Sequence, residues 1–223
     1  MKTILRSPVF TVVLFVLAAA LLGFGTVGAV QAAPRITSND YRAQVQLVDI
    51  DTSLVENGKT VSGDNKLLTT LLADNGDTKL KIGKTYKTKL AVRNTGTIDE
   101  YVRVTVRAYW TNKAGTKVLD VDPSLIKLGL GTGNGWTVDS AATNHDSKTK
   151  RERTVLYYGS PIAPGEDTGA FVDSVTIDGS VVTAITDGKY DYEDLQFRVE
   201  AEVDAVQTHN GTEAMTSAWG RTN

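Results

Sequence analysis

The sequence predicts an all-β fold, a jelly-roll-like antiparallel β-sandwich with short helical pieces. Apolar and polar residues alternate with a period of two over long stretches, and turns separate short stretches of this kind roughly every 8–15 residues. The 223-residue chain contains no cysteine, so a hydrophobic core rather than disulfides must hold it together. About 190 residues can bury roughly 70% of their unfolded surface, so one core suffices.

The composition excludes several classes of protein. The chain is 41% hydrophobic and 22% charged, as ordinary globular proteins are, which excludes disorder over its whole length and a multi-span membrane protein. The absence of cysteine excludes a thiol nucleophile and a zinc finger. Because 24 Lys and Arg face 26 Asp and Glu, no basic excess exists to bind phosphates, and we expect no nucleic-acid partner.

The first 32 residues have the pattern of a secretory signal peptide. Lys2 and Arg6 form a positive start, and an uncharged apolar stretch spans residues 9–30. Two small-x-small endings, residues 27–29 and 30–32, fit a cleavage site, and the second would make Ala33 the first residue of the mature chain. A retained membrane anchor is the alternative, since 22 apolar residues can span a bilayer. The last residues, 217–223, show no anchor or wall-sorting segment. We therefore expect a secreted protein, located in the extracellular matrix or at the cell surface.

Residues 33–47 precede the predicted sandwich domain, which spans residues 48–223. Apolar Ala43, Val45 and Leu47 alternate with polar residues, but after Leu47 the apolar role passes to Val48 and Ile50. A slip of one residue reverses the two faces of a strand. It indicates either a bulge within one strand or a boundary between two pairing partners.

Two long stretches, residues 100–110 and 195–206, alternate most clearly and are predicted to be central, half-buried antiparallel strands. A helix would distribute their β-branched residues around its whole circumference. The predicted core residues are Val102, Val104, Val106 and Trp110 of the first strand, and Phe197, Val199 and Val203 of the second.

Shorter elements fill the rest of the chain. Residues 86–92 alternate before the turn at 94–96, which suggests a hairpin into the strand at 100–110. Residues 66–72 fit a short helix or a buried strand. Residues 210–220 fit a closing helical turn with Gly220 as its stop. The remaining expected strands are residues 153–158, 171–177 and 181–185.

Catalytic motifs are absent. His145 and His209 lie in polar loops without the His-Glu-x-x-His spacing of zinc proteases, and no Gly-x-Ser-x-Gly motif occurs. The glycine-rich stretch 129–135 lacks a phosphate-binding lysine, so it is interpreted as a loop. Acidic clusters at 74–77 and 187–194 could bind calcium, but solvated turns are the favoured interpretation. We therefore expect no catalytic residues, no resident metal and no cofactor, with calcium left open.

Three stretches, residues 92–105, 152–166 and 200–210, together with the ending Ser217-Ala218-Trp219-Gly220, resemble the TasA/camelysin superfamily. Within it, the chain is similar to BsaA-type biofilm matrix proteins. The resemblance implies export through a SipW-type signal peptidase and assembly of jelly-roll subunits into extracellular fibres.

The resemblance also implies a role for residues 33–47 as a donor strand that completes the sheet of the next subunit. The donor residues would be Ile36, Tyr41, Ala43, Val45 and Leu47. The expected partners are identical subunits, the signal peptidase and an accessory or nucleating matrix protein. The sequence does not indicate which sheet edge would accept the donor strand.

Two other functions remain open. Camelysin-like relatives are metallopeptidases, which this chain's two histidines do not favour. A surface adhesin would need exposed aromatic residues on one face. Tyr101 and Tyr109 are expected on the polar face of their strand, with Arg103 and Arg107 between them.

Overall fold

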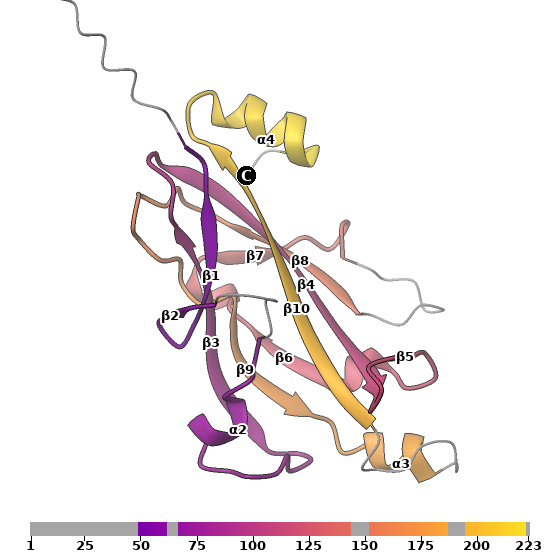
Figure 1. Ribbon diagram of the computed structural model, residues 1–223. Helices are drawn as coiled ribbons and strands as arrows, with labels where there is room; N and C mark the ends of the chain where they lie inside the picture. Colours follow the sequence, from indigo (N-terminus) through magenta and orange to yellow (C-terminus); the bar gives the residue numbers. More distant parts are fainter. Residues whose placement is uncertain (1–48, 62–66, 144–151, 187–194, 222–223) are drawn as a thin grey trace, which may run out of the picture. The chain divides into compact units, whose positions relative to one another are not determined.

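A computed structural model describes residues 49–61, 67–143, 152–186 and 195–221. The chain divides into two units, residues 1–46 and 47–223, and all described residues belong to the second. They form two antiparallel sheets around one core, with a few short helices (Figure 1). The predicted all-β sandwich with short helical pieces is confirmed.

The first sheet, sheet A, has the strand order β2-β1-β3-β9-β6. Its strands are β1 (Thr52–Glu56), β2 (Lys59–Thr60), β3 (Thr85–Asn94), β6 (Ile126–Leu130) and β9 (Val172–Ile177). The second sheet, sheet B, has the order β10-β4-β8-β7, and β5 also pairs with β4. Its strands are β4 (Glu100–Asn112), β5 (Lys117–Val118), β7 (Trp136–Val138), β8 (Arg153–Tyr158) and β10 (Leu195–Gln207).

Short helices connect or flank the strands. They are α2 (Leu71–Asp74), α3 (Val181–Thr186), α4 (Gly211–Trp219), and the 3-10 helices η2 (Pro123–Leu125) and η3 (Thr132–Asn134). The expected closing helix is thus present as α4, and Gly220 ends it in the left-handed region with φ 72°. The ambiguous stretch around residues 66–72 forms a turn followed by α2.

The core lies between the sheets. Val102, Val104 and Val106 of β4 are fully buried, and Trp110 is 3% exposed. Trp136 of β7 joins the two sheets, because its ring meets that of Phe171, just before β9, edge to face at 5.7 Å. Its indole N–H donates to the Gly169 carbonyl at 2.7 Å, so this large side chain is buried with its polar atom satisfied.

The glycine-rich stretch carries the chain from β6 in sheet A through η3 to β7 in sheet B. A side chain at Gly131 would lie 1.8 Å from the Ala170 carbonyl oxygen, so the backbones approach too closely for any other residue. This crossing joins the sheets on the side of the molecule away from β10.

The predicted hairpin between residues 86–92 and the strand at 100–110 is wrong. β3 pairs with β1 and β9 in sheet A, whereas β4 lies in sheet B. The Asn94 side chain prevents a tight turn: its amide donates to the carbonyls of Ile98 and Ile162, and its oxygen accepts from Gly96 N–H. These bonds stabilise a wide loop that crosses between the layers.

The expected strand at residues 181–185 is also wrong, since these residues belong to α3. Asp178 accounts for the difference, because its carboxylate accepts from Ser180 N–H at 2.8 Å and its carbonyl from Val181 N–H at 3.1 Å. Such an Asx turn starts a helix in spite of β-branched residues. Val181 is still 2% exposed, so the helix keeps one residue in the core.

Candidate functional site: the rim along β10

Strand β10 pairs with β4 along all thirteen residues, from Leu195 opposite Asn112 to Gln207 opposite Glu100. Among the described residues no strand pairs with its other edge. The expectation that both long strands are central is therefore correct for β4 and wrong for β10. A long edge strand offers unpaired backbone N–H and C=O groups to a further strand.

The core-facing side of β10 is only half covered. Val199 is 6% exposed, but Phe197, Ala201 and Val203 are partly buried and pack at the margin of the core. Phe197 meets Trp110 edge to face at 6.4 Å. The equivalent valines of β4 are fully buried, so the sandwich is less completely closed along β10.

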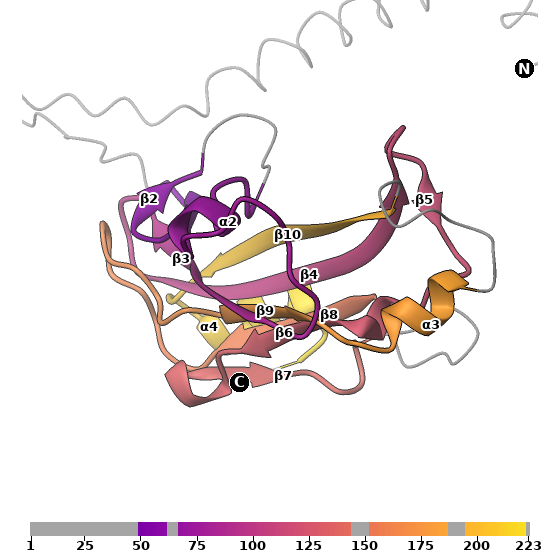
Figure 2. The same cartoon turned by 90° about the horizontal axis from the view of Figure 1, so that it is seen from below.

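A groove of about 550 Å³, lined by both apolar and polar residues, lies beside the first half of β10. In the view from below, α2 and β10 lie on the same side of the sandwich (Figure 2). Leucines of the segment around α2 form one wall and β10 forms the other. The apolar lining residues are Leu67, Leu68, Leu71, Leu72, Leu80, Phe197 and Val199.

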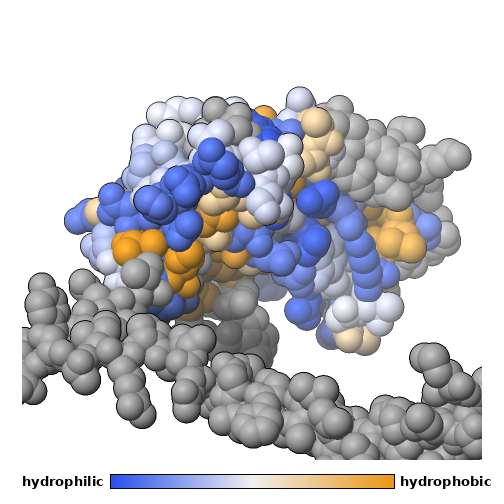
Figure 3. All heavy atoms as spheres, turned by 90° about the horizontal axis from the view of Figure 1, so that it is seen from above, coloured by the Kyte–Doolittle hydropathy of each residue, from blue (hydrophilic) through white to orange (hydrophobic). Residues whose placement is uncertain are grey.

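A second hollow of about 370 Å³ lies beside the last part of β10, near α4. Ile50 of the chain before β1 lines it with Val203 and Ala205 of β10 and Trp219 of α4. Ile50 is 41% exposed. In the view from above, hydrophilic residues cover most of the visible described surface and hydrophobic ones form small separate patches (Figure 3).

We call residues 196–205 of β10, with these two hollows, the β10 rim. The rim has one strand edge that pairs with no strand in the described ranges, an apolar side facing the core and a polar side facing solvent. It extends along most of the long strand that runs from the α3 end to the α4 end of the sandwich (Figure 1).

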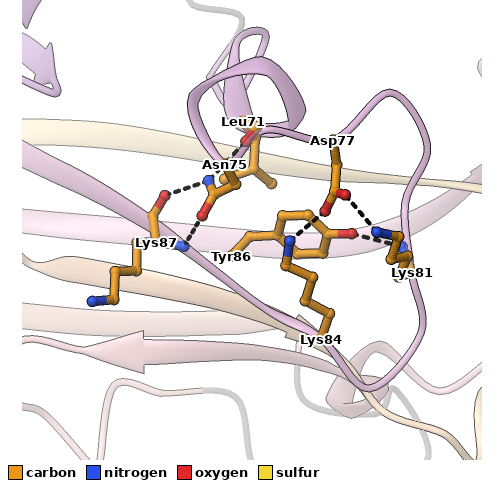
Figure 4. A network of polar contacts seen from close by, with 7 residues as sticks. All are labelled: Leu71, Asn75, Asp77, Lys81, Lys84, Tyr86 and Lys87. Carbon is orange, nitrogen blue, oxygen red and sulfur yellow. Dashed lines mark hydrogen bonds and ion pairs between the residues drawn. The ribbon is translucent and has the colours of Figure 1, made fainter.

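A polar network holds the leucine wall of the groove against β3 (Figure 4). Asp77 accepts from Lys81 at 2.7 Å and from Lys84 at 2.5 Å. These two hydrogen bonds hold the pKa of Asp77 at about 2, well below its ordinary value. The hydroxyl of the fully buried Tyr86 accepts from the Lys81 backbone N–H, and the Asn75 side chain bonds both backbone groups of Lys87.

This network predicts a specific pH dependence. A carboxylate with a lowered pKa stabilises the fold at neutral pH, and its contribution is lost as the pH falls from about 4 to about 2. Asp77→Asn should therefore unfold at lower urea concentration than the wild type at pH 7, with the difference disappearing by pH 2. Asp99→Asn, at an exposed position, is the control. An Asp77→Asn deficit that is equally large at pH 2 would contradict the assignment.

The turn that begins the leucine wall is fastened to β1. The Glu56 carboxylate accepts from the Leu68 N–H with both oxygens at 3.1 Å. Leu68 has φ 65°, a left-handed conformation that is uncommon for a residue other than glycine. Glu56 is 9% exposed, and burial raises the pKa of its carboxyl group. The Glu56–Leu68 contact therefore helps to hold the wall in place.

The polar side of β10 carries a row of acidic residues. Asp204 pairs with Arg103 at 2.7 Å, and Glu202 lies 3.7 Å from Arg107. Glu200 accepts from the Tyr109 hydroxyl. Arg198 is the one basic residue in the same row, and Arg103 and Arg107 of β4 balance Asp204 and Glu202, so the polar side of the rim carries charges of both signs.

The aromatic residues expected on the polar face of β4, Tyr101 and Tyr109, contact other residues of the same chain. The Tyr109 ring lies under Lys117 at 5.2 Å, and the Tyr101 ring packs against Gly211, where a side chain would come within 2.8 Å. Tyr157 packs on Trp219 at 5.5 Å. No open row of aromatic rings for stacking a sugar is therefore formed by these residues.

Several other sequence-predicted residues can be placed. Asp74 accepts from Asn57 and Thr70, so it and Asp77 take part in hydrogen bonds of the groove region. His209 is exposed. Within the described ranges no group of three or more His, Cys, Asp or Glu residues could hold a metal, and no helix is long and apolar enough to cross a membrane. The donor residues Ile36, Tyr41, Ala43, Val45 and Leu47, the acidic cluster 187–194 and His145 lie outside the described residues.

Sequence reasoning did not find the groove. Its leucines come from a stretch of ambiguous periodicity, and the edge position of β10 depends on pairing between distant strands. The spacing of Leu67, Leu68, Leu71 and Leu72 was a signal that the segment covers an apolar surface.

Comparison with models of protein families, with curated proteins and with solved structures found no match for this chain.

Proposed function

We propose that this protein is a secreted structural subunit that polymerises into extracellular fibres of a biofilm matrix. Residues 33–47 of one subunit would add as a strand to the β10 rim of the next. The observation that carries the proposal is the long edge of β10, with which no described strand pairs, beside a groove that has a wall of leucines. In this proposal the protein is not an enzyme, and its partners are copies of itself.

The segment is long enough to cover the rim. Residues 196–205 span about 33 Å at roughly 3.3 Å per strand residue, and ten of the fifteen residues 33–47 reach that distance when extended. Neighbouring strands place side chains on the same two faces. Ala43, Val45 and Leu47 would therefore point toward the apolar side of the rim, as Ala201 and Val203 do.

The two surfaces also match in polarity. The same alternation places Arg42 and its polar neighbours on the side where Glu200, Glu202 and Asp204 lie. Polar side chains of the added strand would then lie beside polar side chains of β10. A segment shifted by one residue would bring its apolar side chains against this polar row.

The resemblance to fibre-forming matrix proteins supports the same conclusion independently of the geometry. It also suggests the SipW-type signal peptidase that would release Ala33 as the new N-terminus, and a nucleating matrix protein. A peptidase or adhesin function receives no comparable support, because the described part of the chain has neither a metal-ligand cluster nor a free aromatic row.

The test is assembly of the chain from Ala33 to Asn223 at rising concentration. Electron microscopy should show unbranched filaments, and sedimentation velocity should show large species that increase at the expense of monomer. A preparation that stays monomeric at all concentrations, with and without preformed seeds, would rule out the proposal.

A further inference from the structure

The chain entering β1 is fastened to a distant loop. Asp49 N–H donates to Thr97 Oγ1 at 2.9 Å, and Thr97 N–H donates back to the Asp49 carbonyl at 2.9 Å. The Asp51 carbonyl accepts from Thr95 N–H at 2.8 Å and from Gly96 N–H at 3.0 Å. These bonds follow directly on the pairing of β1 with β3, which begins at Thr52 opposite Asn94, and they hold residues 49–51 against the loop of residues 95–97.

Gly96 allows this contact because the two backbones nearly touch. A side chain at Gly96 would lie 2.5 Å from the Asp49 carbonyl oxygen and 2.9 Å from the Asp51 nitrogen. Real side chains do not approach backbone atoms so closely, so any other residue must push the segment away. The loop is therefore shaped to hold residues 49–51.

The Glu100 side chain makes a further contact with the segment of residues 49–51. Its side chain is fully buried, and Oε1 accepts from the Asp51 N–H at 2.9 Å. Oε2 has no hydrogen-bond partner among the described residues. Burial raises the pKa of this carboxyl group, with further contributions from the nearby charges of Asp51 and Asp49. Burying a carboxylate with one unpartnered oxygen lowers the stability of the fold. The hydrogen bond that this carboxylate does make is to the Asp51 backbone N–H.

The fastened residues lie at one end of the subunit's own rim. Ile50, Asp51 and Thr52 line the same hollow as Val203, Asp204 and Ala205 of β10. The preceding segment is thus tethered close to a surface that it could pair with in its own subunit. Such self-pairing would compete with polymerisation, because a tethered strand has a high effective concentration.

Self-pairing requires the chain to reverse immediately before β1. Leu47 lies two residues before Asp49, so a reversal that seats Leu47 on the rim must use Val48 and Asp49 as the turn. The backbone N–H and C=O of Asp49 are both already bonded to Thr97. A reversal would break these bonds.

We propose that Asp49–Asp51, Thr95–Thr97 and Glu100 form a clamp that prevents residues 33–47 from completing the rim of their own subunit and so directs them to a second copy. This inference rests on the proposed function, since it concerns the same segment and rim. In the clamp, Glu100 is a positioning residue that acts through the Asp51 backbone, and Gly96 provides the space.

The absence of cysteine allows a direct test by disulfide trapping in the chain from Ala33 to Asn223. Val45→Cys is combined in turn with Ala201→Cys, Val203→Cys or Ala205→Cys, and oxidised products are separated under non-reducing conditions. With the clamp intact, the disulfides should join different subunits into a ladder. With Glu100→Ala or Gly96→Ala, closed monomers with an internal disulfide should increase at least tenfold at the expense of the ladder.

Matched variants separate this role from general destabilisation. Glu100→Gln keeps an oxygen that can accept from Asp51 N–H, so it should retain the wild-type ladder. Gly133→Ala, at a glycine with nothing within 4 Å, should also leave the ladder unchanged. Gly96→Ala disturbs the same contact in a different way, because its Cβ would lie 2.5 Å from both the Asp49 carbonyl oxygen and Glu100 Oε1, so the test survives even if Glu100→Ala fails to fold.

The outcomes distinguish the two proposals. If the parent chain forms neither filaments nor intersubunit disulfides, the proposed function itself fails. If the parent forms the ladder and the folded clamp variants form the same ladder without internal disulfides, the clamp inference is wrong and the proposed function stands.

Discussion

Removal of residues 33–47 is expected to abolish filament formation and leave a soluble, folded monomer. The core does not need these residues, since Val102, Val104 and Val106 are fully buried among described residues that all follow residue 48. Without the segment no strand is available to occupy the rim of a neighbour. Sedimentation velocity of the chain from Val48 to Asn223 should therefore show a single small species at concentrations where the longer chain polymerises.

The truncated chain also provides a positive control. It retains the β10 rim, so it should bind to the end of a growing filament and stop its elongation when added in excess. Circular dichroism should show the same β-sheet signal as the longer chain. Filaments formed by the truncated chain alone would contradict the donor role of residues 33–47.

A lysine at position 201 should block the acceptor side. Ala201 is partly buried at the centre of the rim, on its apolar side. In the free subunit the long lysine side chain can reach solvent past the open edge, whereas an added strand would bury its charge without a partner. Inward-pointing charges on edge strands prevent pairing in natural β-proteins. The concentration needed for assembly should rise at least about a hundredfold, which corresponds to about 2.7 kcal/mol.

Gln196→Lys is the matched control for Ala201→Lys. It introduces the same charge on the same strand, but at an exposed position on the polar side. Its assembly threshold should stay within about threefold of the wild type. A mixture is more informative still: Ala201→Lys subunits keep residues 33–47, so they should join wild-type filaments at one end only. If Ala201→Lys assembles like the wild type while remaining folded, β10 is not the acceptor edge.

Local patterns were sufficient to predict the strands with regular alternation. The burial of Val102, Val104, Val106 and Trp110 follows from side chains that point to opposite faces of a strand, which is a property of neighbouring residues. The end of α4 at Gly220 follows equally from a local preference for the left-handed conformation. These features need no information from elsewhere in the chain.

Other features depend on contacts between residues far apart in the sequence. The Asn94 side chain bonds the Ile162 carbonyl, 68 residues away, and this helps to send β3 and β4 into different sheets. The clamp likewise joins Asp51 to Glu100, 49 residues later.

The alternation along β10 determined that this stretch is a strand and which of its faces is apolar, because both follow from a period of two. It could not determine that β10 lies at the edge of its sheet, because a strand with one neighbour and a strand with two have the same alternation. Only the tertiary structure decided this, by pairing β10 with β4 on one side and with no described strand on the other. The difference lies in backbone hydrogen bonds, which every residue can make and which side-chain identity therefore records only weakly.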